Sequence, residues 1–304
     1  MIKIPAYLKK GDTVGITCPA GFMAYERIEI CVKTLEQWGY KVKVGSTLYS
    51  TSDNYFSGTD AERLADFQQM LDDDSVNAIL CGRGGYGTGR IIEAIDFKKF
   101  RKKPKWIIGF SDITILHTHI FSNYNTATLH APMAGAFADT GVDSKAIQSL
   151  KAALTGKPAK YSIKSSPYNK PGEVTGSLIG GNLALLAHVV GSSSDINTKN
   201  KILFIEDTGE YLYNIDRMLY QLKQGGKLKH LAGLVVGGFT DMKDTQRPFG
   251  KTIYELISDV IKEYNYPVCF DFPVSHSNEN YALKTGVKWG LKVTDKKTVL
   301  KEII

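Results

Sequence analysis

The 304-residue sequence lacks the patterns that mark several common classes of protein. Its four cysteines form no Cys-x-x-Cys pair, so we expect reduced, buried thiols and a cytoplasmic protein. No histidines, cysteines and carboxylates are spaced as metal ligands, and we expect neither a metal nor another cofactor. The glycine-rich segment 82–87 lacks the spacing of Walker and dinucleotide motifs. The cysteines are Cys18, Cys31, Cys81 and Cys269.

Long hydrophobic runs are also missing. The longest apolar stretch, residues 178–190, contains glycines, Asn182 and His188 and is too short to span a bilayer. Residues 1–12 have no apolar segment of the signal-peptide type. The formal net charge is +7, and the strongest basic run, residues 98–105, has no accompanying nucleic-acid motif. We therefore interpret that run as a solvated loop and expect a small anionic substrate, without nucleic acid or membrane as a partner.

Short apolar strands alternate with amphipathic helices along the chain. This alternation predicts an α/β protein with a doubly wound parallel sheet in its N-terminal domain, Rossmann-like or class I glutamine amidotransferase-like. We expect this domain over 1–155, a Pro/Ser/Lys-rich linker over 156–175, and a smaller C-terminal α/β domain over 176–304. The predicted strands are 13–17, 41–44, 76–81, 105–109, 126–130, 201–205, 234–236 and 268–270.

One segment, Lys105–Ile113, predicts a buried strand that runs directly into a helix. Ser111 stands at the junction, where backbone N–H groups and the helix dipole favour negative charge, so its hydroxyl is a candidate nucleophile. The alternative is that Ser111 is a helix N-cap, with Asp112 in the first turn. The Gly-x-Ser-x-Gly pattern is incomplete, because Ile113 replaces its second glycine.

A serine nucleophile needs a base, and the base needs an orienting partner. Among six histidines, His130 ends a predicted strand at the same sheet edge, and His276 lies in a polar loop after a buried run. His117 and His188 fall in apolar helical positions and are expected to be core residues. Glu206 follows a buried strand, either as a cap or as the partner of a histidine.

Five groups of residues together resemble the serine LD-carboxypeptidases, the family of muramoyltetrapeptide carboxypeptidase. The resemblance covers nearly the whole chain, with the groups in the same order and at similar spacing. One departure is Leu283–Gly286, where the family often has a Leu-Pro-x-Gly turn that forms part of one pocket wall. The groups are Arg83–Gly87, Gly109–Asp112, Gly180–Leu183, Phe204–Asp207 with Asp216–Leu219, and His276 with Asn280.

The resemblance implies a Ser111–Glu206–His276 triad and an oxyanion hole of backbone N–H groups from Asp112 and from Gly84 or Gly85. It also implies hydrolysis of the amide between an L-centre and a C-terminal D-amino acid, usually D-alanine, in cytoplasmic murein tetrapeptides during peptidoglycan recycling. The site would lie between the two domains. We further expect a homodimer.

Several alternatives stay open from sequence. Arg83 would meet a substrate carboxylate or form a structural ion pair, and Asn182 is a second candidate substrate contact. Gly84 and Gly85 would form only a tight turn if they had no catalytic use. At the level of function, the alternatives are a hydrolase of peptidyl- or aminoacyl-nucleotides that confers resistance to a nucleotide-peptide antibiotic, and a non-catalytic ligand-binding protein. A thiol enzyme of the glutamine amidotransferase type is disfavoured by the serine at position 111.

Overall fold

The computed structural model describes residues 2–303, which form two compact units. The first unit ends at Lys157 and also includes Tyr281–Lys284, and the second comprises Pro158–Asn280 and the chain from Thr285. The segment 156–175 was expected to be a linker. It instead contains strand β6 and the start of strand β7, so most of it is part of the second unit.

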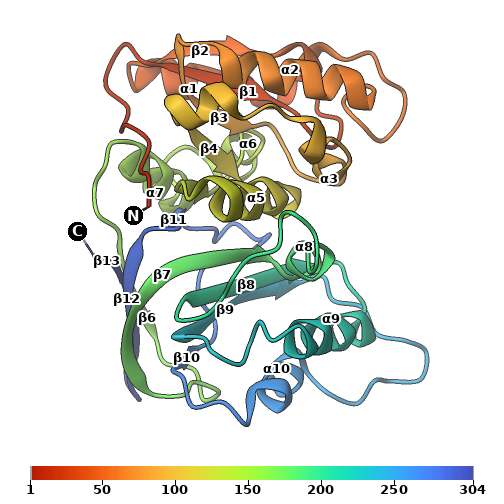
Figure 1. Ribbon diagram of the computed structural model, residues 1–304, viewed down its shortest axis with the longest axis vertical. Coiled ribbons are helices and arrows are strands. Elements are labelled where there is room, and N and C mark those ends of the chain that lie inside the picture. The colour runs from red at the N-terminus through yellow and green to blue at the C-terminus, as the bar shows by residue number, and fades with distance from the viewer. Residues whose placement is uncertain (1, 304) are drawn as a thin grey trace. The chain divides into compact units, whose positions relative to one another are not determined.

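The first unit is built on a six-stranded sheet with the order β11-β5-β4-β3-β1-β2 (Figure 1). Strands β1 to β5 form parallel pairs, as predicted for a doubly wound sheet. The strands are β1 (Thr13–Thr17), β2 (Lys41–Val44), β3 (Val76–Cys81), β4 (Trp106–Gly109), β5 (Thr128–His130) and β11 (Leu283–Thr285). The helices are α1 (Glu29–Gln37), α2 (Asp60–Asp72), α3 (Thr88–Ile91), α4 (Lys98–Lys102), α5 (Thr114–Tyr124), α6 (Ala136–Thr140) and α7 (Lys145–Leu154).

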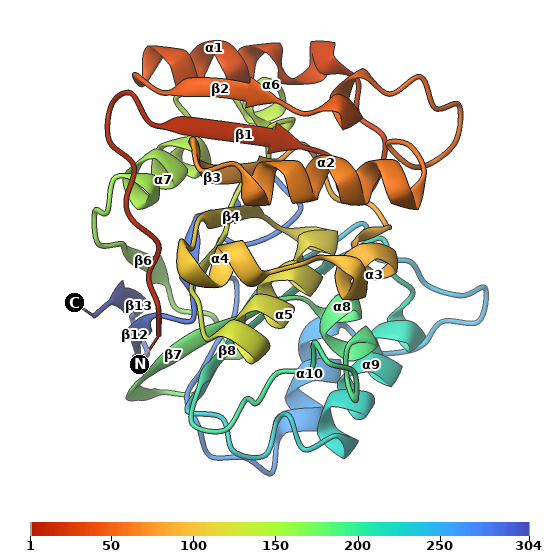
Figure 2. The same cartoon turned by 45° about the horizontal axis from the view of Figure 1, so that its top comes forward.

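Local sequence explains the central elements of this unit. All four residues of β4 are buried, which fits its unbroken apolar run. Helix α2 begins with a capping box, in which Thr59 and Glu62 bond each other's backbone, and it packs against β1 and β3 (Figure 2). The basic run was wrongly interpreted as a loop. Its residues 98–102 form α4, and Lys105 is buried, with its Nζ donating to the carbonyl oxygen of Met70.

The strand order places three loops at one edge of the first sheet. The sequence of neighbours β2-β1-β3-β4-β5 reverses direction between β1 and β3, and ligands of such sheets bind at the carboxyl ends of strands near this reversal. The loops that follow β1, β3 and β4 begin there. The glycine-rich loop 82–87 and Ser111 belong to two of them.

The second unit has a seven-stranded mixed sheet with the order β10-β9-β8-β7-β12-β13-β6. Strands β7 to β10 pair parallel, whereas β12, β13 and β6 continue the sheet antiparallel. Helix α9 packs against both α8 and α10 (Figure 1). The strands are β6 (Lys160–Lys164), β7 (Gly172–Asn182), β8 (Ile202–Thr208), β9 (Gly233–Thr240), β10 (Val268–Cys269), β12 (Lys288–Val293) and β13 (Lys297–Glu302). The helices are α8 (Leu183–His188), α9 (Leu212–Gln224) and α10 (Ile253–Ile261).

Three expectations from the sequence concern the cysteines, long apolar helices and the fold class. The four cysteines are all free and buried, as predicted. Between residues 2 and 303, no helix is both long enough and apolar enough to cross a membrane. The predicted α/β fold class is confirmed.

Candidate active site

Ser111 lies at a sharp turn between β4 and α5. Its φ is 61°, a left-handed conformation that is uncommon for a residue with a side chain and that is typical of a nucleophile held on a strained strand-to-helix turn. The chain turns so tightly that a methyl group at Gly109 would lie 2.9 Å from Cγ1 of Ile113. A short 3₁₀ turn at Ser111–Ile113 precedes α5, and neither the turn nor α5 receives a side-chain cap. The N-cap interpretation of Ser111 is therefore wrong.

The glycine-rich loop after β3 approaches this serine closely. A methyl group at Gly84 would lie 3.0 Å from Cβ and 3.1 Å from Oγ of Ser111, and 3.3 Å from the backbone nitrogen of Asp112. The carbonyl oxygen of Gly84 accepts a hydrogen bond of 3.0 Å from Gly21 N–H, which fixes the orientation of the loop. The N–H groups of Gly84 and Gly85 have no hydrogen-bond acceptor within residues 2–303. They are therefore available to a ligand beside the serine hydroxyl.

Two buried charged side chains hold this loop in place. The carboxylate of Asp112 is 1% exposed and accepts a 2.8 Å hydrogen bond from Thr88 N–H, which joins the serine turn to the start of α3. The guanidinium of Arg63 is fully buried and donates to the carbonyl oxygens of Pro19 and Gly87. These contacts make the loops after β1, β3 and β4 one braced structure.

The second unit independently brings Glu206 and His276 together. Oε2 of Glu206 lies 2.7 Å from Nδ1 of His276, although the two residues are 70 positions apart. Glu206 is inside β8 and fully buried, so it is not a helix cap. Because a carboxylate accepts, Nδ1 carries the proton, and Nε2 is the nitrogen that can accept a proton from a nucleophile. This arrangement is that of a base and its orienting carboxylate.

Burial and nearby carboxylates act in opposite directions on His276. Burial lowers the pKa of His276, but the hydrogen bond that its imidazole donates to Glu206 and the negative charges of Glu206, Asp207 and Asp241 outweigh this effect, so the net pKa is raised. The loop that carries the imidazole is folded around Ser275, whose Oγ donates to the carbonyl oxygen of Glu279 at 3.0 Å. The raised pKa means that the surroundings of His276 stabilise the protonated, positively charged form of its side chain.

A second buried carboxylate, Asp207, directly follows Glu206. Its oxygens accept hydrogen bonds from Asn182 Nδ2 at 2.8 Å, from Ala184 N–H at 3.0 Å and from Thr208 N–H at 2.8 Å. Burial, followed by the charge of Glu206, raises the pKa of Asp207 to about 7. The sequence motif Phe204–Asp207 included this residue, but sequence reasoning gave Asp207 no role of its own, although two adjacent acidic residues at the end of a buried strand were the available signal.

Asn182 and Arg83 were predicted from the sequence to contact the substrate. Asn182 is buried, caps α8 through Leu185 N–H and bonds Asp207, which favours a positioning role over a substrate contact. Arg83 is exposed and donates to the carbonyl oxygen of Phe22 at 3.0 Å, so its contact with a substrate carboxylate stays a prediction.

Two further histidines lie in the first unit. His117 is a buried core residue, as predicted, and its Nε2 donates to the carbonyl oxygen of Gly109 at 2.9 Å. The same prediction for His188 in the second unit was wrong, because His188 is exposed at the end of α8. His130 is fully buried, and its ring lies against those of Phe110 and His117. No group of three or more histidines, cysteines or carboxylates able to hold a metal ion is found in residues 2–303.

Comparison with known proteins gives matches along both units. Residues 14–131 match the LD-carboxypeptidase N-terminal domain, and residues 175–291 match the LD-carboxypeptidase C-terminal domain. The probable murein peptide carboxypeptidase of Bacillus subtilis is 39% identical to this chain, and the alignment covers 97% of this chain and 93% of the relative. The microcin C7 self-immunity protein MccF of Escherichia coli is 27% identical, with 98% and 96% covered.

A similar solved structure is that of muramoyltetrapeptide carboxypeptidase from Oxalobacter formigenes. It superposes with a TM-score of 0.87 at 26% identity and covers 95% of this chain and 98% of that chain. The matches span both units, follow the order expected from the sequence motifs and reach nearly the full length of the relatives. The chain therefore belongs to the LD-carboxypeptidase family of hydrolases.

Proposed function

We propose that this protein is a serine-type LD-carboxypeptidase that uses Ser111, Glu206 and His276 as its catalytic triad. The observation that carries the proposal is the Glu206–His276 pair, because a fully buried carboxylate 2.7 Å from an imidazole fixes a tautomer that can act as a base. The left-handed turn at Ser111 supplies a matching nucleophile in the first unit.

The proposed reaction is acyl transfer in two steps. His276 Nε2 removes the proton of Ser111 Oγ as that oxygen attacks the substrate carbonyl, and the oxyanion is bound by the N–H groups of Asp112 and of Gly84 or Gly85. The C–N bond then breaks, and His276 returns the proton to the departing amine. A water molecule, deprotonated by the same imidazole, hydrolyses the acyl-serine and regenerates the hydroxyl.

The proposed substrate is a murein tetrapeptide with a C-terminal D-amino acid, usually D-alanine, joined to an L-centre. The support is the relationship to proteins named murein peptide carboxypeptidase and muramoyltetrapeptide carboxypeptidase. The net charge of +7 suits a peptide that carries several carboxylates. A cytoplasmic role in peptidoglycan recycling and a homodimeric state belong to the same proposal and rest on the family resemblance.

A second candidate function uses the same chemistry on a nucleotide conjugate. The similarity to the microcin C7 self-immunity protein over nearly the whole chain favours it. The substrate would then be a peptidyl- or aminoacyl-nucleotide, and the pocket rather than the triad would differ.

Product analysis by mass spectrometry tests both candidates. The purified protein is incubated with a murein tetrapeptide and, separately, with an aminoacyl-adenylate mimic. We expect release of D-alanine from the tetrapeptide, and Ser111→Ala should abolish this release while leaving the melting temperature nearly unchanged. Near-normal turnover by Ser111→Ala would refute the serine mechanism, and selective cleavage of the adenylate mimic would favour the second candidate.

A further inference from the structure

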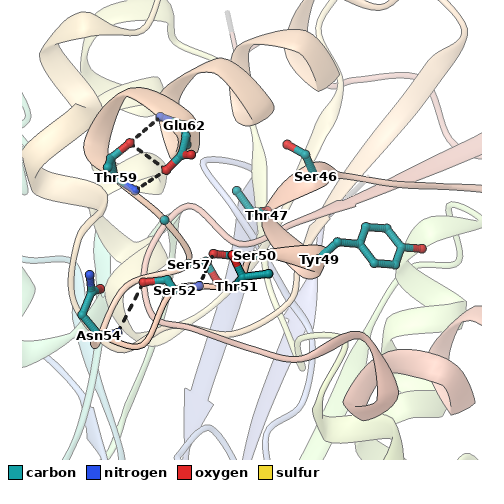
Figure 3. A pocket seen from close by; sticks show the side chains of 11 residues that line it. Ser46, Thr47, Tyr49, Ser50, Thr51, Ser52, Asn54, Ser57, Thr59 and Glu62 are labelled. Atoms are coloured by element: carbon teal, nitrogen blue, oxygen red, sulfur yellow. Dashed lines mark hydrogen bonds between the residues drawn. The ribbon is translucent and has the colours of Figure 1, made fainter.

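A polar pocket of about 410 Å³ lies in the first unit, between the end of β2 and the start of α2 (Figure 3). It is formed by side chains from residues 46–62, and we call it the hydroxyl pocket. Seven of its eleven lining residues are serine or threonine. Its volume is within the range of about 300–1,000 Å³ that is typical of small-molecule sites.

One wall of the hydroxyl pocket is rigid. Thr47 is buried, and its Oγ1 donates to the buried carboxylate of Asp66, which also accepts the backbone N–H of Ser46 at 2.8 Å. Ser57 is buried as well and donates to the carbonyl oxygen of Gly21 at 3.2 Å. These groups are satisfied by the protein itself, so they shape the pocket rather than bind a ligand.

A second part of the lining, residues 50–54, keeps hydrogen-bonding capacity. The hydroxyl oxygens of Ser50 and Ser52 accept backbone N–H groups, which leaves their own hydrogens to donate. Asn54 uses Oδ1 to accept from Phe56 N–H at 2.9 Å. Neither the Asn54 Nδ2 group nor the Thr51 hydroxyl has a hydrogen-bond partner among the described residues, and both residues are exposed. This part of the lining offers donors and acceptors side by side.

The charge of the pocket restricts what it can bind. Glu62 is its one ionisable side chain apart from the phenol of Tyr49, and no lysine, arginine or histidine lines it. The backbone and hydroxyl hydrogen bonds from Thr59 lower the pKa of Glu62, so its carboxylate is charged at neutral pH. Phosphate and carboxylate ligands would meet a like charge. A lining of hydroxyls and an amide equally disfavours an apolar ligand, because its burial would leave those groups unpaired.

The remaining class is a neutral ligand with many hydroxyl and amide groups. Sugar hydroxyls both donate and accept, which matches serine, threonine and asparagine side chains and a carboxylate acceptor. An N-acetylated sugar ring adds an amide that can do the same.

The hydroxyl pocket is connected to the glycine-rich loop. The carbonyl oxygen of Tyr55, in the pocket's outer loop, accepts a 2.9 Å hydrogen bond from Phe22 N–H, and a methyl group at Gly85 would lie 2.8 Å from Oη of Tyr55. Loop 50–58 therefore forms a wall of the pocket and also contacts the backbone beside Ser111. We propose that the hydroxyl pocket binds a neutral N-acetylated sugar ring attached to the peptide substrate, an inference that rests on the proposed function.

Kinetics on two substrates test this proposal. We expect kcat/KM for N-acetylmuramoyl-tetrapeptide to exceed that for the free tetrapeptide by about tenfold or less, as expected from one or two net hydrogen bonds. Thr51→Val and Asn54→Asp should each reduce this preference several-fold through KM and leave the free-peptide value unchanged. Asn54→Asp keeps the acceptor for Phe56 N–H, so the loop is preserved. Thr175→Val, at an exposed threonine in β7, is the matched control.

Binding measured without turnover separates the possible outcomes. Di-N-acetylchitobiose is titrated into the Ser111→Ala protein by calorimetry, with inorganic phosphate as the anionic comparison. Saturable sugar binding that Thr51→Val weakens supports the pocket even if no murein peptide is cleaved, which would refute only the proposed function. Equal cleavage of both peptides by wild type and variants, or binding of phosphate in place of the sugar, would overturn the sugar-binding proposal.

Discussion

Gly84→Ala is the substitution whose effect the structure specifies most closely. The added methyl group would lie 3.0 Å from Cβ and 3.1 Å from Oγ of Ser111, and 3.3 Å from Asp112 N, distances at which these atoms must shift by a few tenths of an ångström. Gly84 has no positive φ, so alanine adds no backbone strain. The damage should therefore be confined to the serine hydroxyl and the oxyanion donors.

We expect Gly84→Ala to lower kcat by about 10²–10³, the usual cost of losing one oxyanion donor. The melting temperature should stay within a few degrees of wild type, because alanine also restricts the unfolded chain. Steady-state kinetics on a murein tetrapeptide and a thermal melt measure the two effects. Gly290→Ala is the control, since its methyl group would meet only flexible side chains, with Cδ1 of Ile303 at 3.3 Å and Cε of Lys301 at 3.6 Å. Wild-type kcat in a folded Gly84→Ala variant would refute the placement of the glycine-rich loop at the reacting carbonyl.

Three further predictions concern the second unit. Glu206→Gln should lower kcat by roughly 10²–10⁴. Because Glu206 raises the pKa of His276, the acid limb of the kcat/KM profile of this variant should also move to lower pH. A normal rate together with a lowered melting temperature would exclude Glu206 from the active site. Asn182→Ala should lower kcat with little change in KM, because it releases Asp207 and uncaps α8, and a selective rise in KM would instead indicate a substrate contact. The folded-state pKa of Asp207 is raised, so the native state binds its proton more readily and this group's contribution to the free energy of unfolding declines as pH rises from about 4 to about 7. Urea titrations across that range should show a shallower decline in Asp207→Asn, and an unchanged slope would contradict the assignment.

Most strands in the parallel part of each sheet could be predicted from sequence, because they are short, apolar and bounded by clear turn residues. The predicted strands 13–17, 41–44 and 76–81 have the same bounds as β1, β2 and β3. Strands β6, β7, β11, β12 and β13 were missed. In β6, Tyr161 and Ile163 alternate with polar residues, but the strand exists only because it pairs with β13, more than a hundred residues later.

In the candidate site, too, features set by neighbouring residues could be predicted from sequence, whereas contacts between distant residues could not. The position of Ser111 at a strand-to-helix turn was visible in nine consecutive residues, whereas its left-handed φ was not. Glu206 and His276 were singled out by their places after buried strands, but only the folded chain brings them within 2.7 Å. Arg63 was not noticed at all, because a fully buried arginine has no distinctive local pattern.

Strand β11 gives the order of synthesis a role in how this protein folds. Residues 281–284 belong to the first unit, and β11 pairs with β5, yet β11 leaves the ribosome only after residues 158–280, most of the second unit, have been made. Until then the edge of β5 is an open template for pairing with another chain, which is a known route to aggregation. A fragment that stops at Lys157 would retain that open edge permanently, so the first unit is not a self-sufficient piece despite its contiguous sequence.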